Sequence, residues 1–400
     1  MADAEVARML AQCVAEPEND EPRLVWADAV GGERGELVVL QCQLARGGRS
    51  PEVSGTLRRR QRELLEQHGR AWAGLAGLAT YSRFRRGFVE VATFEAATFC
   101  DHSDEIFAIA PFLRSVVIAA APADDWRRLF DHPGYARLRG LGLRGISGPP
   151  EHNDEVIAFA VAHHAFARLE SLDVYRLGPV ATHELVASNQ LRALTRLVLG
   201  PSGVVGDGLP ALFATMPNLR ALDMRHLGDT TELVPALPPR ITELMIHVSA
   251  FAALARSPIA ANLERLTLYD LDTTGALPEL AAFPKLRSLD IYMRTFREEV
   301  VLGPGFAATP LPALRELRCR GISLDGARAV AEAIGAQLEL FHVIGFHPGL
   351  DIESARPRVA GDLFADLYMP AAPPLFAGEL PEAPMWDYPY VHYPPASRAT

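Results

Sequence analysis

A single hydrophobic pattern recurs through the middle of the chain. It consists of an apolar residue, two variable residues, a second apolar residue, one variable residue and a third apolar residue. Clear copies begin at Leu113, Leu138, Leu169, Leu194, Leu219, Ile241, Leu263, Leu286, Leu314 and Leu338, and a weaker copy begins at Phe88. Successive copies start 22 to 31 residues apart. One such hexad is a weak signal, but ten in register indicate an array of stacked structural units.

Each copy predicts a short strand followed by a return segment. The second half of the hexad alternates apolar and polar residues, which is typical of a strand with one buried face. One unit cannot bury its leucines alone, so stacked units share a core and pair their strands into a parallel sheet. The repeat length is that of leucine-rich repeats. We therefore predict an α/β fold, a leucine-rich-repeat solenoid over residues 87–345. Its curved parallel sheet lies on the concave side, with mixed helices and loops on the convex side.

Three further segments complete the predicted organisation. Residues 1–48 contain helix start signals, such as Asp20-Glu21-Pro22, and are predicted to form a small helical module. Residues 49–86 are predicted to form a basic helical linker. Residues 346–400 lack the repeat and are rich in proline. We predict that this tail caps the open end of the solenoid or, alternatively, serves as a polyproline docking segment.

The N-terminal module carries a resemblance to a known family. The run E-P-E-N-D-E-P-R-L-V-W-A-D begins at Glu16, and E-R-G-E-L-V-V-L-Q follows from Glu33 to Gln41. These residues resemble the repeat-companion domain of bacterial leucine-rich-repeat proteins, found in myxobacterial and planctomycete families. The resemblance covers roughly 45 of the 400 residues. The family usually continues with Trp-Leu-Glu-Glu, whereas Ala-Val-Gly-Gly stands at residues 29–32 here. The resemblance implies a bacterial origin and this architecture, and it supplies no catalytic residue.

Composition narrows the class of protein. Apolar residues make up 49% of the chain and charged residues 22%, which is typical of a globular protein. The net charge of −10 argues against non-specific binding to nucleic acid. The N-terminus lacks the basic and apolar regions of a signal peptide, and no apolar run is long enough for a membrane span. Four widely spaced cysteines form no C-x-x-C pair, so neither a disulfide framework nor a zinc site is predicted. We expect a cytoplasmic protein.

A search for catalytic motifs finds none. The sequence has no phosphate-binding loop of the G-x-x-x-x-G-K-[ST] type, no G-x-S-x-G elbow and no H-E-x-x-H zinc helix. His163 and His164 are adjacent in a predicted helix, so their side chains point to different faces and form a poor metal pair. We therefore predict that the protein is not an enzyme and uses no metal or cofactor.

The strand positions that point away from the leucines offer a candidate binding surface. Positions just after the last apolar residue of a hexad include Arg144, Tyr175, Arg225, His247, Tyr269, Tyr292 and Arg320. Positions between the last two apolar residues include Asp173, Asp223 and Asp290, with Arg318 and His342. Arginine and tyrosine are favoured at binding hot spots. We predict that this column binds a protein or peptide partner. The same charges could instead pair between neighbouring strands and keep the sheet soluble.

An arginine-rich stretch offers an alternative function. Arginines cluster in Arg58–Arg62 and again in Arg83–Arg86. This pattern is typical of a nucleic-acid contact, but it is also typical of a solvated helix face whose arginines pair with the acidic remainder of the chain. We consider the second interpretation the stronger one, and therefore expect no nucleic-acid partner.

Overall fold

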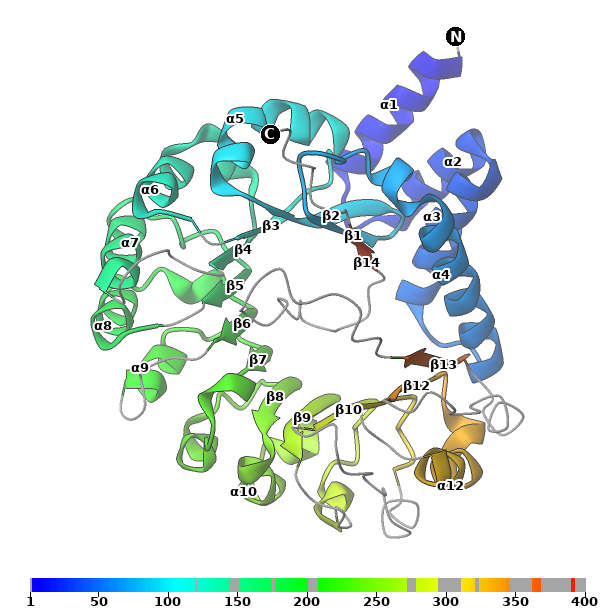
Figure 1. Ribbon diagram of the computed structural model, residues 1–400, viewed down its shortest axis with the longest axis vertical. Coiled ribbons are helices and arrows are strands. Elements are labelled where there is room, and N and C mark those ends of the chain that lie inside the picture. Colours follow the sequence, from blue (N-terminus) through cyan, green and yellow to red (C-terminus); the bar gives the residue numbers. More distant parts are fainter. Residues whose placement is uncertain are drawn as a thin grey trace. The chain divides into compact units, whose positions relative to one another are not determined.

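The protein forms two compact units, whose elements are shown in Figure 1. The computed structural model describes residues 2–119, 121–143, 151–174, 177–200, 208–271, 278–293, 311–320, 324–345, 362–367 and 390–392. The first unit comprises Met1–Gly48, Leu57–Leu172 and Pro381–Thr400, and the second comprises Arg49–Thr56 and Asp173–Leu380. One of the junctions between these segments, from Leu172 to Asp173, falls within a single strand.

The first unit begins with the predicted helical module. Its helices are α1 (Ala2–Ala15), α2 (Asp20–Val30) and α3 (Gly32–Arg46), followed by α4 (Pro51–Ala73), which belongs to this unit from Leu57 onward. The side chain of Asn19 caps α2 by accepting a hydrogen bond from the backbone N–H of Glu21, 3.0 Å away. Helices α2 and α3 approach closely at Gly35, where a Cβ would collide with the backbone of Ala27. Glycine therefore permits the tight helix pair at this position.

The module shares its core with the start of the sheet. Trp26 and Val38, from α2 and α3, belong to the same buried cluster as Phe88 and Phe112. The rings of Trp26 and Phe88 lie 5.0 Å apart, and those of Phe88 and Phe112 lie 4.2 Å apart. The helical module therefore covers the apolar end of the repeat array in this unit, as a solenoid terminus requires.

A hairpin starts the sheet of the first unit. Strand β1 (Tyr81–Arg85) pairs antiparallel with β2 (Phe88–Phe94). Arg86 and Gly87 both have positive φ, 48° and 88°, as a two-residue hairpin turn of the primed type requires. The expected helical linker therefore stops at the end of α4, and its last residues form a strand instead. The physical reason is the alternation in Y-S-R-F-R, which buries Ser82 and Phe84 fully.

Parallel strands follow the hairpin in the order of the sequence. Strand β3 (Ser115–Ile118) pairs with β2, and β4 (Gly140–Leu143) pairs with β3. On the other side, β14 (Tyr390–His392) pairs antiparallel with the outer edge of β1. The convex elements of this unit are α5 (Ala96–Ile109), α6 (Ala123–Asp131), η1 (Pro133–Arg137) and α7 (Glu151–Ala162). Helix α6 buries Trp126, Leu129 and Phe130, which share one face at helical spacing.

The second unit continues the repeat. After β5 (Ser171–Val174), its strands are β6 (Arg196–Leu199), β7 (Ala221–Asp223), β8 (Glu243–His247), β9 (Arg265–Leu271), β10 (Ser288–Met293), β11 (Glu316–Arg320), β12 (Leu340–Gly345) and β13 (Asp362–Leu367). Neighbours in this order pair in parallel from β6 to β13. The last strand, β13, comes from the proline-rich tail and extends the sheet beyond β12.

The register of this sheet places the repeat leucines in one row. Leu222, Leu244, Leu266, Leu289 and Leu317 lie opposite one another on successive strands, and none is more than 2% exposed. A slip of one residue would turn this row to the other face. The buried row therefore confirms the predicted register and the predicted fold class, a leucine-rich-repeat solenoid with an open, mostly parallel sheet.

The convex elements of the second unit mix helices with 3-10 turns. Those described are α8 (Pro179–Ser188), η2 (Leu191–Ala193), α9 (Gly208–Ala214), η3 (Arg225–Leu227), η4 (Thr231–Ala236), η5 (Val248–Ala250), α10 (Phe251–Ala255), η6 (Ala260–Asn262), η7 (Pro278–Ala282), α12 (Leu324–Ile334) and η8 (Gly335–Gln337). The shortest return segments hold only 3-10 turns and one short helix, and η4 contains Pro235. Proline lacks the N–H that a continuing helix needs, so a long helix cannot form there.

The same backbone hydrogen bonds recur between successive copies of the repeat. The residue after the first apolar position uses its carbonyl to accept two backbone N–H groups from the following copy. In the first unit, the carbonyl of Arg114 accepts from Arg139 at 2.7 Å and from Gly140 at 3.0 Å. In the second unit, the carbonyl of Arg287 accepts from Arg315 at 2.8 Å. These hydrogen bonds join successive copies through the backbone alone, without any side chain.

Candidate functional site

Several described members of the predicted binding column lie on the face of the sheet opposite the leucine row, which we call the concave face; they are Asp223, His247, Tyr269, Asp290 and Tyr292. The three aspartates of the column, Asp173, Asp223 and Asp290, are 9%, 2% and 0% exposed. Arg225 and Tyr292 are each 2% exposed, whereas His247 and Tyr269 are half-buried. The structure therefore differs from the expectation of a fully exposed column, and the contacts of these side chains explain the difference.

Asp223 and Arg225 are buried because they pair with each other. Strand β7 ends at Asp223, and the 3-10 turn η3 begins at Arg225. The turn brings the guanidinium back, so that its Nη2 lies 3.0 Å from the Asp223 Oδ2 atom. Asp223 Oδ1 also accepts a hydrogen bond from the backbone N–H of Arg225 at 3.2 Å. This ion pair joins the last residue of β7 to the first residue of η3. Both residues are 2% exposed, so they offer little surface to a partner.

A second buried ion cluster joins β10 and β11. Asp290 and Arg318 lie directly opposite each other in the parallel register. Arg318 Nη1 lies 3.2 Å from Asp290 Oδ1, and its Nη2 lies 3.3 Å from Glu316 Oε2. One guanidinium therefore joins two carboxylates across neighbouring strands. This is the lateral pairing that the sequence allowed as the alternative to partner binding.

Aromatic side chains gather where β7, β9 and β10 end. The rings of Tyr269 and Tyr292 lie 6.1 Å apart at an angle of 36°, and the ring of His226 meets Tyr269 at 5.4 Å and 62°. His226 and Tyr269 are half-buried, and Tyr292 supports them as a buried neighbour. We call these three residues the aromatic cluster. Offset and tilted rings at such distances are favourable contacts that still leave ring surface for a ligand.

Polar groups lie near the aromatic cluster. His247 is opposite Tyr269 in the register of β8 and β9. Its Nδ1 accepts a hydrogen bond from the backbone N–H of Ser249 at 3.2 Å and so caps the turn η5. The Ser249 hydroxyl donates to Asp229 Oδ1 at 3.1 Å. Hydrogen bonds from Thr231 and Ser249 outweigh a small burial effect and lower the pKa of Asp229 below its ordinary value, so it stays charged.

The structure brings together two of the predicted column residues and adds one that the sequence did not single out. Tyr269 and Tyr292 are in ring contact, while His226 was missed because the prediction placed Arg225 at the end of the strand. The three-residue strand β7 ends early, and the turn presents the next residue instead. Arg144 and Tyr175 lie outside the described residues, and Arg320 is placed only through its backbone at the end of β11. Their roles stay predictions.

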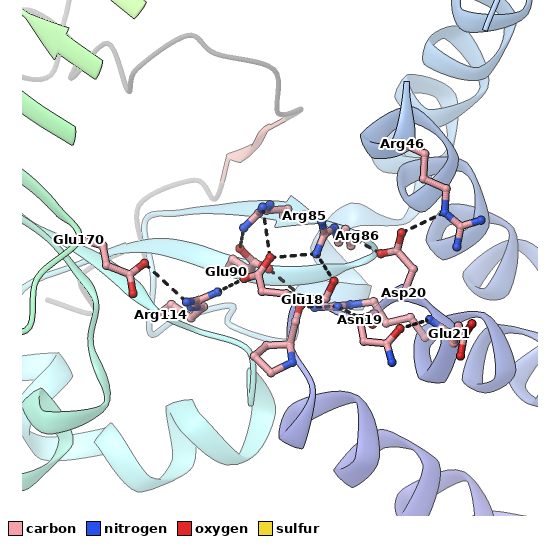
Figure 2. Close-up of polar contacts among 12 residues, drawn as sticks. Glu18, Asn19, Asp20, Glu21, Arg46, Arg85, Arg86, Glu90, Arg114 and Glu170 are labelled. Carbon is pink, nitrogen blue, oxygen red and sulfur yellow. Dashed lines mark hydrogen bonds and ion pairs between the residues drawn. The ribbon is translucent and has the colours of Figure 1, made fainter. Parts of the chain in front are cut away.

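Three arginines of the alternative nucleic-acid site have acidic partners, namely Arg60, Arg85 and Arg86. In α4, both Arg60 Nε and Nη2 donate to Glu36 at 2.8 Å, and Arg60 also lies 3.4 Å from Glu33. In the hairpin turn, Arg86 lies 3.1 Å from Glu18 and 3.3 Å from Asp20. Figure 2 shows the second group, in which acids before and within α2 meet arginines of the hairpin. These contacts favour the interpretation of internal pairing.

Glu18 and Glu90 are the anions at the centre of the group in Figure 2. Glu18 lies 3.7 Å from Arg85 and also pairs with Arg114. Burial raises the pKa of Glu18, but the guanidiniums of Arg114, Arg85 and Arg86 outweigh burial and hold this pKa below its ordinary value. Burial raises the pKa of Glu90, which the arginines oppose only in part. The group attaches the helical module to the sheet within the first unit.

The described residues supply no evident catalytic centre. Within them, no group of three histidine, cysteine, aspartate or glutamate side chains is arranged to hold a metal ion. All four cysteines are buried free thiols, Cys13, Cys42, Cys100 and Cys319. Burial raises the pKa of each, to about 12 for Cys42, which keeps these thiols protonated and unreactive. None of the helices described is both long enough and apolar enough to span a bilayer.

Comparisons with known proteins come from solved structures alone. No family model and no curated protein matches the chain. The chain resembles the leucine-rich repeat-containing protein LegL7 from Legionella pneumophila, with a TM-score of 0.41 and 15% identity over 62% of this chain and 90% of that one. It also resembles a chain of the Rad7 and Elc1 complex of yeast, with a TM-score of 0.42 and 14% identity over 83% of this chain and 92% of that one. The fold assignment rests on the repeat and register of this chain, and these likenesses carry no argument about function.

Proposed function

We propose that the protein is a non-enzymatic interaction scaffold that binds a protein or peptide partner on its concave face, at the aromatic cluster. The observation that carries this proposal is the contact between the half-buried rings of His226 in η3 and Tyr269 in β9, which the buried ring of Tyr292 supports from β10. Such rings combine a large apolar surface with a polar group and lose little entropy on binding. His247, opposite Tyr269 in the register, supplies a polar group beside the rings, and charged Asp229 is linked to His247 through Ser249. These groups can fix a partner's orientation.

The rest of the predicted column has a different role in this proposal. Asp223, Arg225 and Asp290 are buried and paired, so they stabilise the sheet and position the aromatic cluster. Arg144, Tyr175 and Arg320 remain candidates for the edges of the binding surface. A nucleic-acid partner is disfavoured because Arg60 and Arg86 are already paired with carboxylates.

We further propose a cytoplasmic location and a bacterial origin, with residues 1–48 as a repeat-companion module. Four free, buried thiols favour a reducing compartment, because disulfides are typical of oxidising ones. The intact P-R-L-V-W-A-D segment of α2 supports the module, since its Trp26 packs on Phe88 of the first repeat strand.

Site-specific photo-crosslinking tests the proposed binding surface. A photoreactive phenylalanine analogue is placed at Tyr269, or as a control at His183, an exposed residue of α8, and crosslinked proteins from the source lysate are identified by mass spectrometry. We expect a defined protein to crosslink at position 269 and not at 183. The double variant His226→Ala, Tyr269→Ala should lose that protein in affinity capture, while His183→Ala retains it. Equal crosslinking at both positions, or full capture by the double variant, would contradict the proposal.

A further inference from the structure

A hollow in the first unit brings three arginines together. It has a volume of about 200 Å³ and lies among α1, the loop before β3 and the loop before β4. Its apolar wall includes Pro17, Pro111 and Phe112, and its polar wall consists of Arg114, Arg137 and Arg139. No acidic residue lines it. We call it the arginine hollow. Its volume is below the roughly 300 Å³ at which drug-sized ligand pockets begin, so it suits one or two side chains.

The repeat itself places two of these arginines side by side. Arg114 and Arg139 each follow the first apolar residue of a copy, and the backbone N–H of Arg139 donates to the carbonyl of Arg114 at 2.7 Å. Arg137 is the last residue of η1, two positions before Arg139. The repeat and η1 therefore place all three arginines in the lining of one hollow.

Neutral groups hold two of the guanidiniums in place. Arg137 lies over the ring of Phe107, with its Cζ 3.8 Å from the ring centroid. Arg139 Nη1 donates to the carbonyl of Leu138 at 3.0 Å. Within the described part of the chain, neither arginine has a carboxylate partner. Arg114 differs, since it pairs with Glu18 and lies 3.7 Å from Glu170.

This arrangement leaves positive charge uncancelled at a fixed position. A guanidinium has five N–H donors, so Arg137 and Arg139 retain donors after these contacts. Contacts with a ring face and a carbonyl orient a guanidinium without neutralising it, which reduces the entropy lost when an anion binds. The chain as a whole carries a net charge of −10, whereas the lining of the arginine hollow contains three arginines and no acidic residue.

We propose that the arginine hollow binds an acidic segment of a partner protein, with an aspartate or glutamate carboxylate between Arg137 and Arg139. An apolar side chain beside that carboxylate packs against Pro17 and Pro111, which are half-buried. Arginine suits this role because its planar fork matches a carboxylate in two parallel hydrogen bonds. The site lies in the first unit and uses none of the aromatic cluster, so it can be tested independently of the proposed function.

Fluorescence anisotropy with short peptides tests this site on the full chain. The probe is fluorescein-labelled Leu-Asp-Glu-Leu amide, and the neutral control is Leu-Asn-Gln-Leu amide. We expect only the acidic peptide to bind, with weaker binding as NaCl rises from about 50 to about 300 mM. The double variant Arg137→Ala, Arg139→Ala should weaken binding at least about tenfold. Arg168→Ala is the matched control, because Arg168 precedes the first leucine of the next copy as Arg137 does.

Each contrary result overturns the proposal. Equal binding of the neutral peptide would show that the site does not recognise charge. An equal loss of peptide affinity in Arg168→Ala would show that the peptide responds to the overall charge of the protein and not to this site. Unchanged peptide affinity in the double variant would show that the peptide does not bind in the arginine hollow. The absence of binding at millimolar peptide would contradict the proposal as well. Orthophosphate that binds as tightly as the peptide would identify a free-anion site instead. Matching circular dichroism melting curves of the variants and wild type show that any loss of affinity is not a loss of folding.

Discussion

The buried contacts of Arg318 with Asp290 and Glu316 predict how much the charges of the concave face contribute to folding stability. Arg318 is 10% exposed at its side chain, Asp290 is fully buried, and Glu316 is 9% exposed at its side chain. Replacing Arg318 with methionine keeps an apolar stem but leaves two carboxylates without their shared cation. Breaking a buried ion pair in this way costs about 3–5 kcal/mol of unfolding free energy. We expect Arg318→Met to lose about that amount.

A double-mutant cycle isolates the pair between Arg318 and Asp290. All variants carry Glu316→Gln, so that the third charge does not obscure the result. Asp290→Leu together with Arg318→Met leaves no buried charge, and we expect this pair of substitutions to recover about 2 kcal/mol relative to the sum of the single losses. An exposed pair, Arg127 with Asp124 at 2.9 Å, is the matched control and should couple by less than about 1 kcal/mol.

Urea unfolding followed by circular dichroism gives the free energies. A repeat array can unfold in pieces, so amide hydrogen exchange of β10 and β11 supplies a local measure of the same quantity. A coupling energy below about 0.5 kcal/mol between Arg318 and Asp290 would match an exposed pair. That result would refute the reasoning that the paired charges of the concave face contribute to folding stability.

Two further predictions concern the first unit. Glu18→Gln should lower stability by only about 1 kcal/mol at neutral pH, because the Glu18 side chain is 58% exposed. The pKa of Glu18 is lowered on folding, so its contribution is present above the ordinary value of 4.5 and is lost as pH falls through the folded-state value. Melting curves of wild type and variant should therefore converge in acid, and a constant gap would contradict this sign. Ending the chain at Leu380 removes β14, so the amides of Tyr81–Arg83 should exchange faster and the open edge should promote association. A chain that lacks only residues 393–400 retains β14 and should match wild type in exchange mass spectrometry, and protection of β1 in both truncations would rule out the pairing.

The sequence contained enough information for the fold and only part of the information for the site. The leucine row could be predicted because hydrophobic spacing alone sets which face of a strand is buried, and Leu289 lies where its hexad requires. The strand β1 could not be distinguished from the arginine-rich helix before it by charge, and its alternation is only five residues long. His226 could not be found because the end of β7 depends on a 3-10 turn, which the hexad pattern does not encode.

The burial of charge on the concave face follows from the geometry of a parallel repeat. Neighbouring strands lie about 4.8 Å apart, so the same position in successive copies brings two side chains into contact. Asp290 therefore meets Arg318, and Tyr269 meets Tyr292, whether or not a partner binds. Residue type alone is then a poor guide to binding, because arginine and aspartate in such a column can pair with each other, whereas Tyr269 stays half-buried beside its tyrosine neighbour. A side chain is better placed to contact a partner where the ladder is interrupted, as it is at η3, where His226 follows the shortened β7.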